Sequence, residues 1–387
     1  MSARFGGIQP EAFRKKHNLW LAYASEIGAP LLRLAANARA RGSVTPNTTW
    51  RRGLIIGHTH IGDVLYRTCS LPVLREYLPS CEWTYLTSSG SAEILRGNPH
   101  VAEVLASVRG ENSWDLDDGA FAELKLREFD VVLCSNTLRH YPDLLLGVAL
   151  GIPNRFAFAG KGFSGLVTHS VPLPFPSPYA AYFRTMVGNV VGRSPDWALR
   201  PRVYPSESDE KKANELWDGF GLETSRPVVA CSLTTRQARG NWPVEVMIAI
   251  LQNARSRVDF DVVLCGTATD AQALQAIGET LPFDVRTLAG DAGILGFAAF
   301  LQKCSALLTL DSGPRHIGNA VGVPVVFGRN LSHSMVEAGS YCDTEIDLAP
   351  PVEFLEDEDV ARVARSQPVD LLADKLVATL SASGQRE

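Results

Sequence analysis

The 387-residue sequence has no apolar run that approaches the ~20 residues needed to cross a bilayer. Hydrophobic residues make up 45% of the chain and charged residues 20%, which is typical of a soluble globular protein. The N-terminus lacks the charged region, short apolar core and small-residue cleavage site of an export signal. We therefore expect a cytoplasmic protein.

Cysteine pairs at metal-binding or redox spacing are also missing. The seven cysteines are dispersed without any C-x-x-C pair, and several stand in apolar contexts such as "VVLCS" and "VVLCG". This pattern argues against a disulfide framework or a zinc site. The net charge is −5 and there is no long basic run, which argues against nucleic acid as the main partner.

Positive charge is concentrated at the N-terminus. Residues 1–41 contain seven Lys or Arg and two acidic residues, a net charge of +5, which leaves −10 for the rest. The pattern predicts two helices broken near Gly28 and Pro30. Their apolar faces carry Phe13, Trp20, Leu21, Leu31 and Leu32. Such helices pack on the first domain or on a second subunit, or they rest on an anionic membrane surface, and both interpretations stay open.

Strand and helix patterns alternate after a linker that ends near residue 50. Apolar, β-branched runs occur in two series, at 53–57, 83–86, 101–105 and 130–134, and at 227–233, 261–265, 285–288, 306–310 and 323–327. Chains that exceed ~250 to 300 residues usually divide into domains. Runs of this kind indicate parallel sheets covered on both faces, so two series indicate two doubly wound α/β domains.

A proline-rich segment, residues 169–208, separates the two series. Proline is poor material for a sheet interior, so we predict a loop and hinge in the proline-rich parts of this segment, with the domain boundary near Pro205. The predicted parts are a basic helical extension and linker, an N-terminal domain, a C-terminal domain and a C-terminal helical segment, at 1–50, 51–205, 206–350 and 351–387. Ligands of such sheets bind beyond the carboxyl ends of the strands, and a cleft between the domains is the expected site.

Polar residues crowd the turn that follows the first predicted strand, in "IIGHTHIGDVLYRT". Gly57 and Gly62 permit backbone conformations and close approaches that other residues resist. Asp63 stands at the start of the predicted helix, where aspartate is a preferred cap and faces the positive end of the helix dipole. The residue alone leaves capping and catalysis open.

A second polar turn lies in "ALLTLDSGPRHIGNAVGVPVVFG", which predicts a strand, a turn at Asp311, Ser312 and Gly313, and a helix that begins near Pro314. The N–H groups and the hydroxyl at such a helix start form an anion site, to which His316 can add a donor. An ordinary capped turn explains the aspartate and the proline. It does not explain why Ser, Gly, Arg and His gather at one helix end.

Two more predicted strands end in polar residues. In "VVACSLTTRQARGNWP" the hydroxyls and cations are Thr234, Thr235, Arg236 and Arg239. In "VVLCGTATDAQAL" the strand is followed by Asp270, which can accept hydrogen bonds from ribose hydroxyls or cap the next helix.

From about Arg52 to the C-terminus these stretches resemble the heptosyltransferase family, glycosyltransferase family 9. The resemblance rests on "GDVLYRTCSLPVLREYLP", "TTRQARGNWP" and "DSGPRHIGNAVGVPVV", which occur in the family's order. Weaker support comes from "AEILRGNPHVAEVLA" and "GIPNRFAFAGKGFSGLVTHSVPLP". The resemblance implies the GT-B fold, in which two Rossmann-like domains face a cleft, here with an added helical extension.

The resemblance also implies residue roles. Asp63 would be the base that activates the acceptor hydroxyl, and the donor diphosphate would bind at Asp311, Ser312, Gly313 and His316, with Thr234 and Thr235 nearby. The family usually has a lysine where Gly240 stands; Arg239 can replace it, since a guanidinium clamps phosphate oxygens. The "HTH" turn departs from the family, so His58 and His60, together with Lys161, are acceptor-side candidates.

The implied reaction is an inverting transfer of a sugar, a heptose in most of the family, from a donor such as ADP-heptose to a hydroxyl on a glycan, lipid-linked saccharide, protein or natural product. Cations and helix N–H groups would stabilise the leaving diphosphate, so we expect no metal and no cofactor. Two alternatives stay open: a sugar-nucleotide epimerase of the same fold and a non-catalytic sugar-nucleotide-binding protein. Peripheral membrane contact or self-association through residues 1–41 also stays open.

Overall fold

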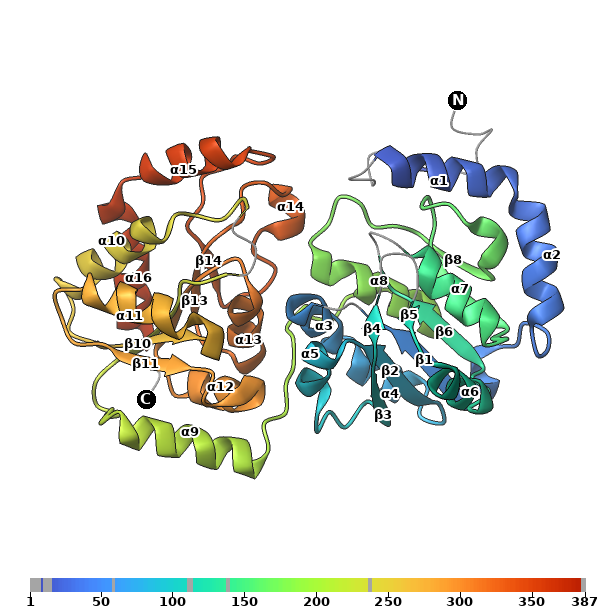
Figure 1. Cartoon of the computed structure of the whole chain (residues 1–387), viewed down its shortest axis with the longest axis horizontal. Coiled ribbons are helices and arrows are strands. Elements are labelled where there is room, and N and C mark those ends of the chain that lie inside the picture. The colour runs from blue at the N-terminus through green and yellow to red at the C-terminus, as the bar shows by residue number, and fades with distance from the viewer. Residues whose placement is uncertain are drawn as a thin grey trace. The chain divides into compact units, whose positions relative to one another are not determined.

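The computed structural model describes residues 8–9, 16–57, 60–109, 114–136, 140–235 and 239–383 (Figure 1). The chain divides into two compact units, residues 1–199 and 200–387. The division falls shortly before Pro205, in the coil that precedes the first helix of the second unit. Each unit contains its own six-stranded parallel sheet with helices on its faces.

The sheet of unit 1 has the strand order β3-β2-β1-β6-β7-β8. The strands are β1 (Arg52–Ile56), β2 (Glu82–Thr87), β3 (Glu103–Ala106), β6 (Val131–Cys134), β7 (Asn154–Phe158) and β8 (His169–Val171). A short antiparallel pair, β4 (Val108–Arg109) and β5 (Trp114–Asp115), stands apart. The chain builds outward from β1 in one direction and then returns to build from β6 in the other, so the sheet has its topological switch point between β1 and β6.

Unit 1 has helices along its sheet and at its N-terminus. The α-helices are α1 (Lys16–Ile27), α2 (Ala29–Arg39), α3 (Ile61–Thr68), α4 (Leu71–Tyr77), α5 (Ser89–Ala92), α6 (Asp118–Leu126), α7 (Tyr141–Ala149) and α8 (Tyr179–Val191). Single 3₁₀ turns are η3 (Asn47–Thr49), η4 (Glu93–Leu95) and η5 (Ser164–Leu166).

The sheet of unit 2 repeats the pattern with the order β11-β10-β9-β12-β13-β14. The strands are β9 (Val228–Ser232), β10 (Asp261–Gly266), β11 (Arg286–Ala289), β12 (Ala306–Leu310), β13 (Val325–Gly328) and β14 (Glu345–Asp347). The helices are α9 (Glu207–Gly219), η6 (Ala268–Asp270), α10 (Val244–Arg255), α11 (Ala271–Glu279), α12 (Gly293–Gln302), α13 (Gly313–Val321), α14 (Met335–Ala338), α15 (Asp357–Arg365) and α16 (Val369–Ser383). The switch point lies between β9 and β12.

The central strands are those that hydrophobicity predicts, because they are buried on both faces and read as continuous apolar runs. The sequence misses β7, whose first residues are polar, and the short strands β8 and β14 at the sheet edges. Between the proline-rich parts of the 169–208 segment, residues 179–191 form the largely buried helix α8, for which no prediction is made from the sequence. No proline lies inside that stretch; Pro178 stands directly before the helix.

The two predicted N-terminal helices form and pack on unit 1, but through a different face than their large apolar residues suggest. The buried residues are small, Ala22, Ser25 and Ala36, whereas Trp20 and Leu31 are exposed. Leu21 is exposed as well, and only Leu32 packs partly against the core. Phe13 lies outside the described residues.

The small residues allow the helices to approach a glycine-rich loop closely. A Cβ atom on Gly162 would lie 2.7 Å from the Ala22 Cβ, and one on Gly165 would lie 2.3 Å from the Ala29 carbonyl oxygen. Only glycine fits such contacts without a backbone shift. None of the helices within the described part of the chain is long and apolar enough to span a membrane.

Candidate active site

The first candidate region lies at the switch point of unit 1, where α3 follows β1. Helix α3 begins at Ile61, earlier than the sequence suggests, with exposed His60 at the N-cap position. Asp63 is therefore the third helical residue, and its side chain is half-buried. A carboxylate in the first turn is stabilised in its ionised form by the helix dipole. His58 lies outside the described residues.

A buried arginine, Arg67, fixes this turn to the end of a neighbouring strand. Its Nε donates to the Ser135 Oγ at 2.8 Å, and its Nη2 donates to the Ser135 carbonyl oxygen at 3.0 Å. Its Nη1 donates to the Asp63 carbonyl oxygen one turn earlier. Ser135 directly follows β6, so the first turn of α3 and the carboxyl end of β6 are held together. The sequence predicts no role for Arg67, although its four-residue spacing from Asp63 places both on one helix face.

Lys161, the third acceptor-side candidate, is buried in the loop that α1 covers. Hydrogen bonds from the extension hold this loop: the Phe163 N–H donates to the Ser25 Oγ at 2.7 Å, and the Ser164 N–H and hydroxyl donate to the Glu26 carboxylate at 2.8 and 2.6 Å. The Gln9 N–H also donates to the Gly160 carbonyl oxygen at 3.0 Å. The loop that carries Lys161 is thus ordered by a segment that precedes the family-like part of the chain.

His140 packs against the same loop, with its Nε2 3.1 Å from the Gly162 carbonyl oxygen. Burial lowers the pKa of His140 from 6.5 to about 4; the hydrogen bond to Gly162 opposes this shift and the charge of Lys161 adds to it. The folded unit therefore holds a neutral imidazole at neutral pH.

We expect unit 1 to lose stability as the pH falls from about 6.5 to about 4, because the unfolded chain takes up the His140 proton first. Because the folded pKa of His140 is lower than its unfolded pKa, the folded unit keeps its full stability above about pH 6.5. It loses this part of its stability as the pH falls to about 4. This pKa shift corresponds to a loss of about 3 kcal/mol in the free energy of unfolding. Urea unfolding at about pH 7 and about pH 4.5 should show a smaller acid loss in His140→Asn than in the parent. An equal loss in both proteins would contradict the assignment.

The second candidate region lies at the switch point of unit 2. Strands β9 and β12 are neighbours, with Ser232 opposite Thr309, so the residues that follow them leave the sheet side by side. These are half-buried Thr234 and Thr235 after β9, and Asp311 and Ser312 after β12. Ser312 is the N-cap of α13, which begins at Gly313 with Pro314 in its first turn, as predicted.

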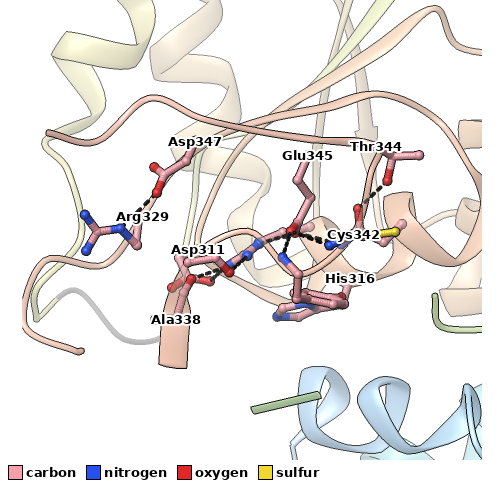
Figure 2. Close-up of polar contacts among 12 residues, drawn as sticks. Asp311, His316, Arg329, Ala338, Cys342, Thr344, Glu345 and Asp347 are labelled. Atoms are coloured by element: carbon pink, nitrogen blue, oxygen red, sulfur yellow. Dashed lines mark hydrogen bonds and ion pairs between the residues drawn. The ribbon is translucent and has the colours of Figure 1, made fainter. Parts of the chain in front are cut away.

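A fully buried guanidinium, that of Arg315, organises this turn. Its Nη1 donates to the Asp311 Oδ1 at 2.8 Å and its Nε to the Glu345 Oε1 at 2.6 Å. It also donates to the carbonyl oxygens of Ala338 and Gly339 at 2.8 and 2.7 Å, and its Cζ lies 3.7 Å from the centroid of the Phe327 ring. Figure 2 shows Asp311 and Glu345 joined through this network, with His316 beside it. The family resemblance implies no role for Arg315.

The network keeps Asp311 ionised. Burial alone would raise the pKa of this carboxyl, but the charges of Arg315, His316 and His333 outweigh it and hold the pKa below its ordinary value. The carboxylate is thus directed at Arg315 and at the Asn330 N–H, 3.4 Å from its Oδ2. Asp311 shapes the turn as a fixed anion.

His316 is buried in the second half of the first turn of α13. Its Nδ1 lies 2.9 Å from the Tyr341 hydroxyl, and the centroids of the two rings are 5.7 Å apart. Either atom can be the donor of this hydrogen bond, depending on the protonation of the ring. Tyr341 in turn donates its N–H to the Glu345 Oε2 at 2.7 Å, so the ring and the arginine network share one support. Tyr341 and Glu345 carry no local sequence signal of this role.

The position at which the family usually has a lysine has no room for a side chain in this protein. Gly240 has φ of +76°, and a Cβ there would lie 2.1 Å from the Asn330 Oδ1. The neighbouring Arg239 is exposed and pairs with Glu356 at 3.1 Å. Such a surface pair contributes 0 to about 1 kcal/mol, so it does not fix the guanidinium strongly. Arg236 lies outside the described residues.

Asp270 takes part in a capping box. Its Oδ2 accepts from the Thr267 N–H at 2.8 Å and from the Thr267 hydroxyl at 2.5 Å. One of its carboxylate oxygens therefore caps the start of η6. A role toward ribose stays a prediction.

No group of three or more His, Cys, Asp or Glu side chains able to hold a metal ion occurs within the described residues. A surface depression of about 400 Å³ lies at the amino ends of β1 and β2, lined by residues that include Trp50 and Cys81. Because the polar turns follow the carboxyl ends of the strands, this depression is not the candidate site.

Residues 197–331 match the profile of glycosyltransferase family 9 (heptosyltransferase). The stretch contains the 311–316 turn and both threonines. The lipopolysaccharide core heptosyltransferase OpsX of Haemophilus influenzae is 23% identical over 291 residues, which cover 73% of this chain and 79% of that protein. The second unit of the chain is thus similar to glycosyltransferase family 9, and most of the chain is similar to a heptosyltransferase.

Solved structures agree on the GT-B fold. A family 9 glycosyl transferase from Veillonella parvula superposes with a TM-score of 0.71 at 17% identity, covering 89% of this chain and 100% of that one. The ADP-heptose lipopolysaccharide heptosyltransferase II of Escherichia coli superposes with a TM-score of 0.66 at 19% identity, covering 86% and 99%. The chain thus has the GT-B fold, with two Rossmann-like domains and an added N-terminal helix pair.

Proposed function

We propose that this protein is a family 9 glycosyltransferase that moves a heptose from ADP-heptose to a hydroxyl of a glycan or lipid-linked saccharide, with inversion and without a metal. The observation that carries the proposal is the 311–316 turn, a helix N-terminus at a sheet switch point whose carboxylate is paired with a buried arginine. Support for the donor comes from relatives: an Escherichia coli heptosyltransferase with ADP superposes with a TM-score of 0.60, at 15% identity over 86% of this chain and 98% of that one.

The donor diphosphate binds at the start of α13 in this proposal. The N–H groups of the first turn and the positive end of the helix dipole favour an anion. The Ser312 hydroxyl, Thr234 and the His316 ring add donors around it. Arg315, which Asp311 shares with Glu345, offsets part of the repulsion between the Asp311 carboxylate and the diphosphate. Arg239 would leave its exposed partner Glu356 and add a cation.

Asp63 acts as the general base. The acceptor hydroxyl gives its proton to the Asp63 carboxylate while its oxygen forms a bond to the anomeric carbon. The bond between that carbon and the diphosphate oxygen breaks, and the diphosphate leaves with the electron pair. Attack opposite the leaving group inverts the anomeric centre. The N–H groups of α13 stabilise the charge that develops on the diphosphate, which supplies the stabilisation that a metal gives elsewhere.

His316→Ala is expected to weaken donor binding by roughly 10- to 150-fold, because a hydrogen bond to a charged group is worth about 1.5 to 3 kcal/mol. Calorimetric titration with ADP measures the change. Tyr341→Phe is the matched control, since it removes only the hydroxyl that lies 2.9 Å from the ring and should cost less. Unchanged ADP affinity in folded His316→Ala would remove His316 from the diphosphate site.

A screen of nucleotide sugars tests the proposal. The protein is incubated with ADP-, UDP- and GDP-linked sugars, with and without extracts of glycans and glycolipids, and released nucleoside diphosphate is measured. We expect release from ADP-heptose that depends on the acceptor extract. A change in sugar configuration without an acceptor would indicate an epimerase. Binding without turnover for every donor and extract would indicate a non-catalytic protein.

A further inference from the structure

Helices α1 and α2 carry large apolar side chains on the face turned away from unit 1. Trp20 and Ile27 on α1 are 72% and 75% exposed, and Leu31 and Leu34 on α2 are 75% and 69% exposed. Exposed alanines follow the same spacing at positions 24, 35 and 38. Residues spaced by three, four and seven share one helix face, so each helix presents an apolar stripe to solvent.

The helices that carry these stripes are fixed to unit 1 by their opposite face. The opposite face is anchored by the contacts of Ser25 and Glu26 with the 160–165 loop and by the packing of Ala22 and Ala29 against its glycines. In Figure 1 the two helices lie along the side of unit 1, outside α7 and β8. The large apolar residues are thus held outward while the small ones are buried. A monomer in water gains nothing from this arrangement, so the stripes indicate a binding surface.

The charges around the stripes indicate which partner fits. Arg33 and Arg39 on α2 are exposed, whereas the carboxylate of Glu26 is turned to the Ser164 N–H and hydroxyl. A two-fold contact between copies would bring this positive surface against itself, which costs free energy. An anionic lipid surface complements both the charge and the stripes.

We propose that α1 and α2 form a docking surface for an anionic membrane, with Trp20, Ile27, Leu31 and Leu34 inserted at the boundary of headgroups and acyl chains. The helices, of 12 and 11 residues, lie in the interface and do not cross it. Because the same helices hold the loop of Lys161, docking places a candidate acceptor-side loop next to the lipid surface. The proposal concerns binding and does not rest on the identity of the donor.

Co-sedimentation of the full chain with vesicles tests the surface. We expect binding to vesicles of phosphatidylcholine with phosphatidylglycerol, little binding to phosphatidylcholine alone, and weakening at high salt. Leu31→Ser with Leu34→Ser should weaken binding about 100-fold. Arg33→Glu with Arg39→Glu should weaken binding to the anionic vesicles without touching the stripe. Leu126→Ser with Leu371→Ser, which removes two exposed leucines elsewhere, should leave binding unchanged.

All of these positions are exposed, so thermal melts of the variants should match the parent and separate lost binding from lost folding. No binding of the parent to anionic vesicles would overturn the proposal. So would equal losses in the stripe variant and the Leu126/Leu371 control. Sedimentation that shows a dimer of the parent and a monomer of the Leu31/Leu34 variant, without vesicle binding, would assign the surface to a second copy instead.

Discussion

Asp63→Asn is expected to lower turnover by roughly 10²- to 10⁴-fold while ADP binding persists, which is the range for losing a positioned general base. Asparagine keeps the size of the side chain and much of its hydrogen bonding but cannot accept the acceptor proton. The residue stands in the first turn of α3, one turn before the guanidinium of Arg67 that fixes this turn to β6. A steady-state assay with donor and acceptor, together with a thermal melt, measures the effect.

The purely structural role of Asp63 predicts a different result. Asparagine serves the start of a helix about as well as aspartate, so stability and turnover would both barely change. Glu93→Gln, on η4 of the same unit, is a matched carboxylate-to-amide control and should leave turnover unchanged. Near-normal turnover in Asp63→Asn would remove this residue from the mechanism and make His60 or His58 the next candidate base.

Arg315→Met is expected to lower the stability of unit 2 by about 3 to 5 kcal/mol and to abolish tight ADP binding. The change leaves the carboxylates of Asp311 and Glu345 buried without their shared cation, and breaking one partner of a buried ion pair costs this much. It also releases the Ala338 and Gly339 carbonyls, so the 311–316 turn loses its support. Urea unfolding and calorimetry with ADP measure the two effects.

Arg329→Met provides the control for stability alone. Arg329 is also buried and pairs with Asp347 at 2.9 Å, to the side of the first network in Figure 2. Its loss should destabilise unit 2 and leave the affinity of the folded fraction for ADP close to that of the parent. Equal affinities for ADP in the two variants would show that Arg315 does not position the donor site.

The sequence predicts the parts of the fold that depend on local pattern. Strands such as β1, β6, β9 and β12 are short apolar runs between helical patterns, and their order in a doubly wound fold follows from right-handed crossovers. Hydrophobic pattern alone therefore assigns the polar residues after these strands to the sheet ends. The start of α13 at the Ser-Gly-Pro turn follows from capping and proline rules alone.

The contacts that hold the site residues in place join residues far apart in the sequence, so the local pattern does not predict them. Arg315 reaches Asp311 at a helical spacing of four, which a sequence can suggest, but it reaches Glu345 30 residues away through the short edge strand β14. Arg67 similarly joins Ser135 across 68 residues. Such partners are set by tertiary packing.

The N-terminal helices show the same limit in another form. Periodicity predicts the two helices and the break between them, yet it assigns their large residues to the face that would normally pack. Steric fit decides otherwise, because only the Ala22 and Ala29 side can approach Gly162 and Gly165 closely. The exposed position of Trp20 and Leu31 is therefore a property of the fold that composition does not reveal.

The most direct test of heptosyl transfer follows the sugar itself. The protein is incubated with ADP-heptose that carries an isotopic label in the heptose, together with glycan and glycolipid fractions, and the fractions are examined by mass spectrometry. We predict a labelled acceptor heavier by one heptosyl residue, with one ADP released for each label transferred and an inverted anomeric configuration by NMR. Release of ADP with no label in any fraction, or transfer from UDP- or GDP-sugars but not from ADP-heptose, would contradict the account.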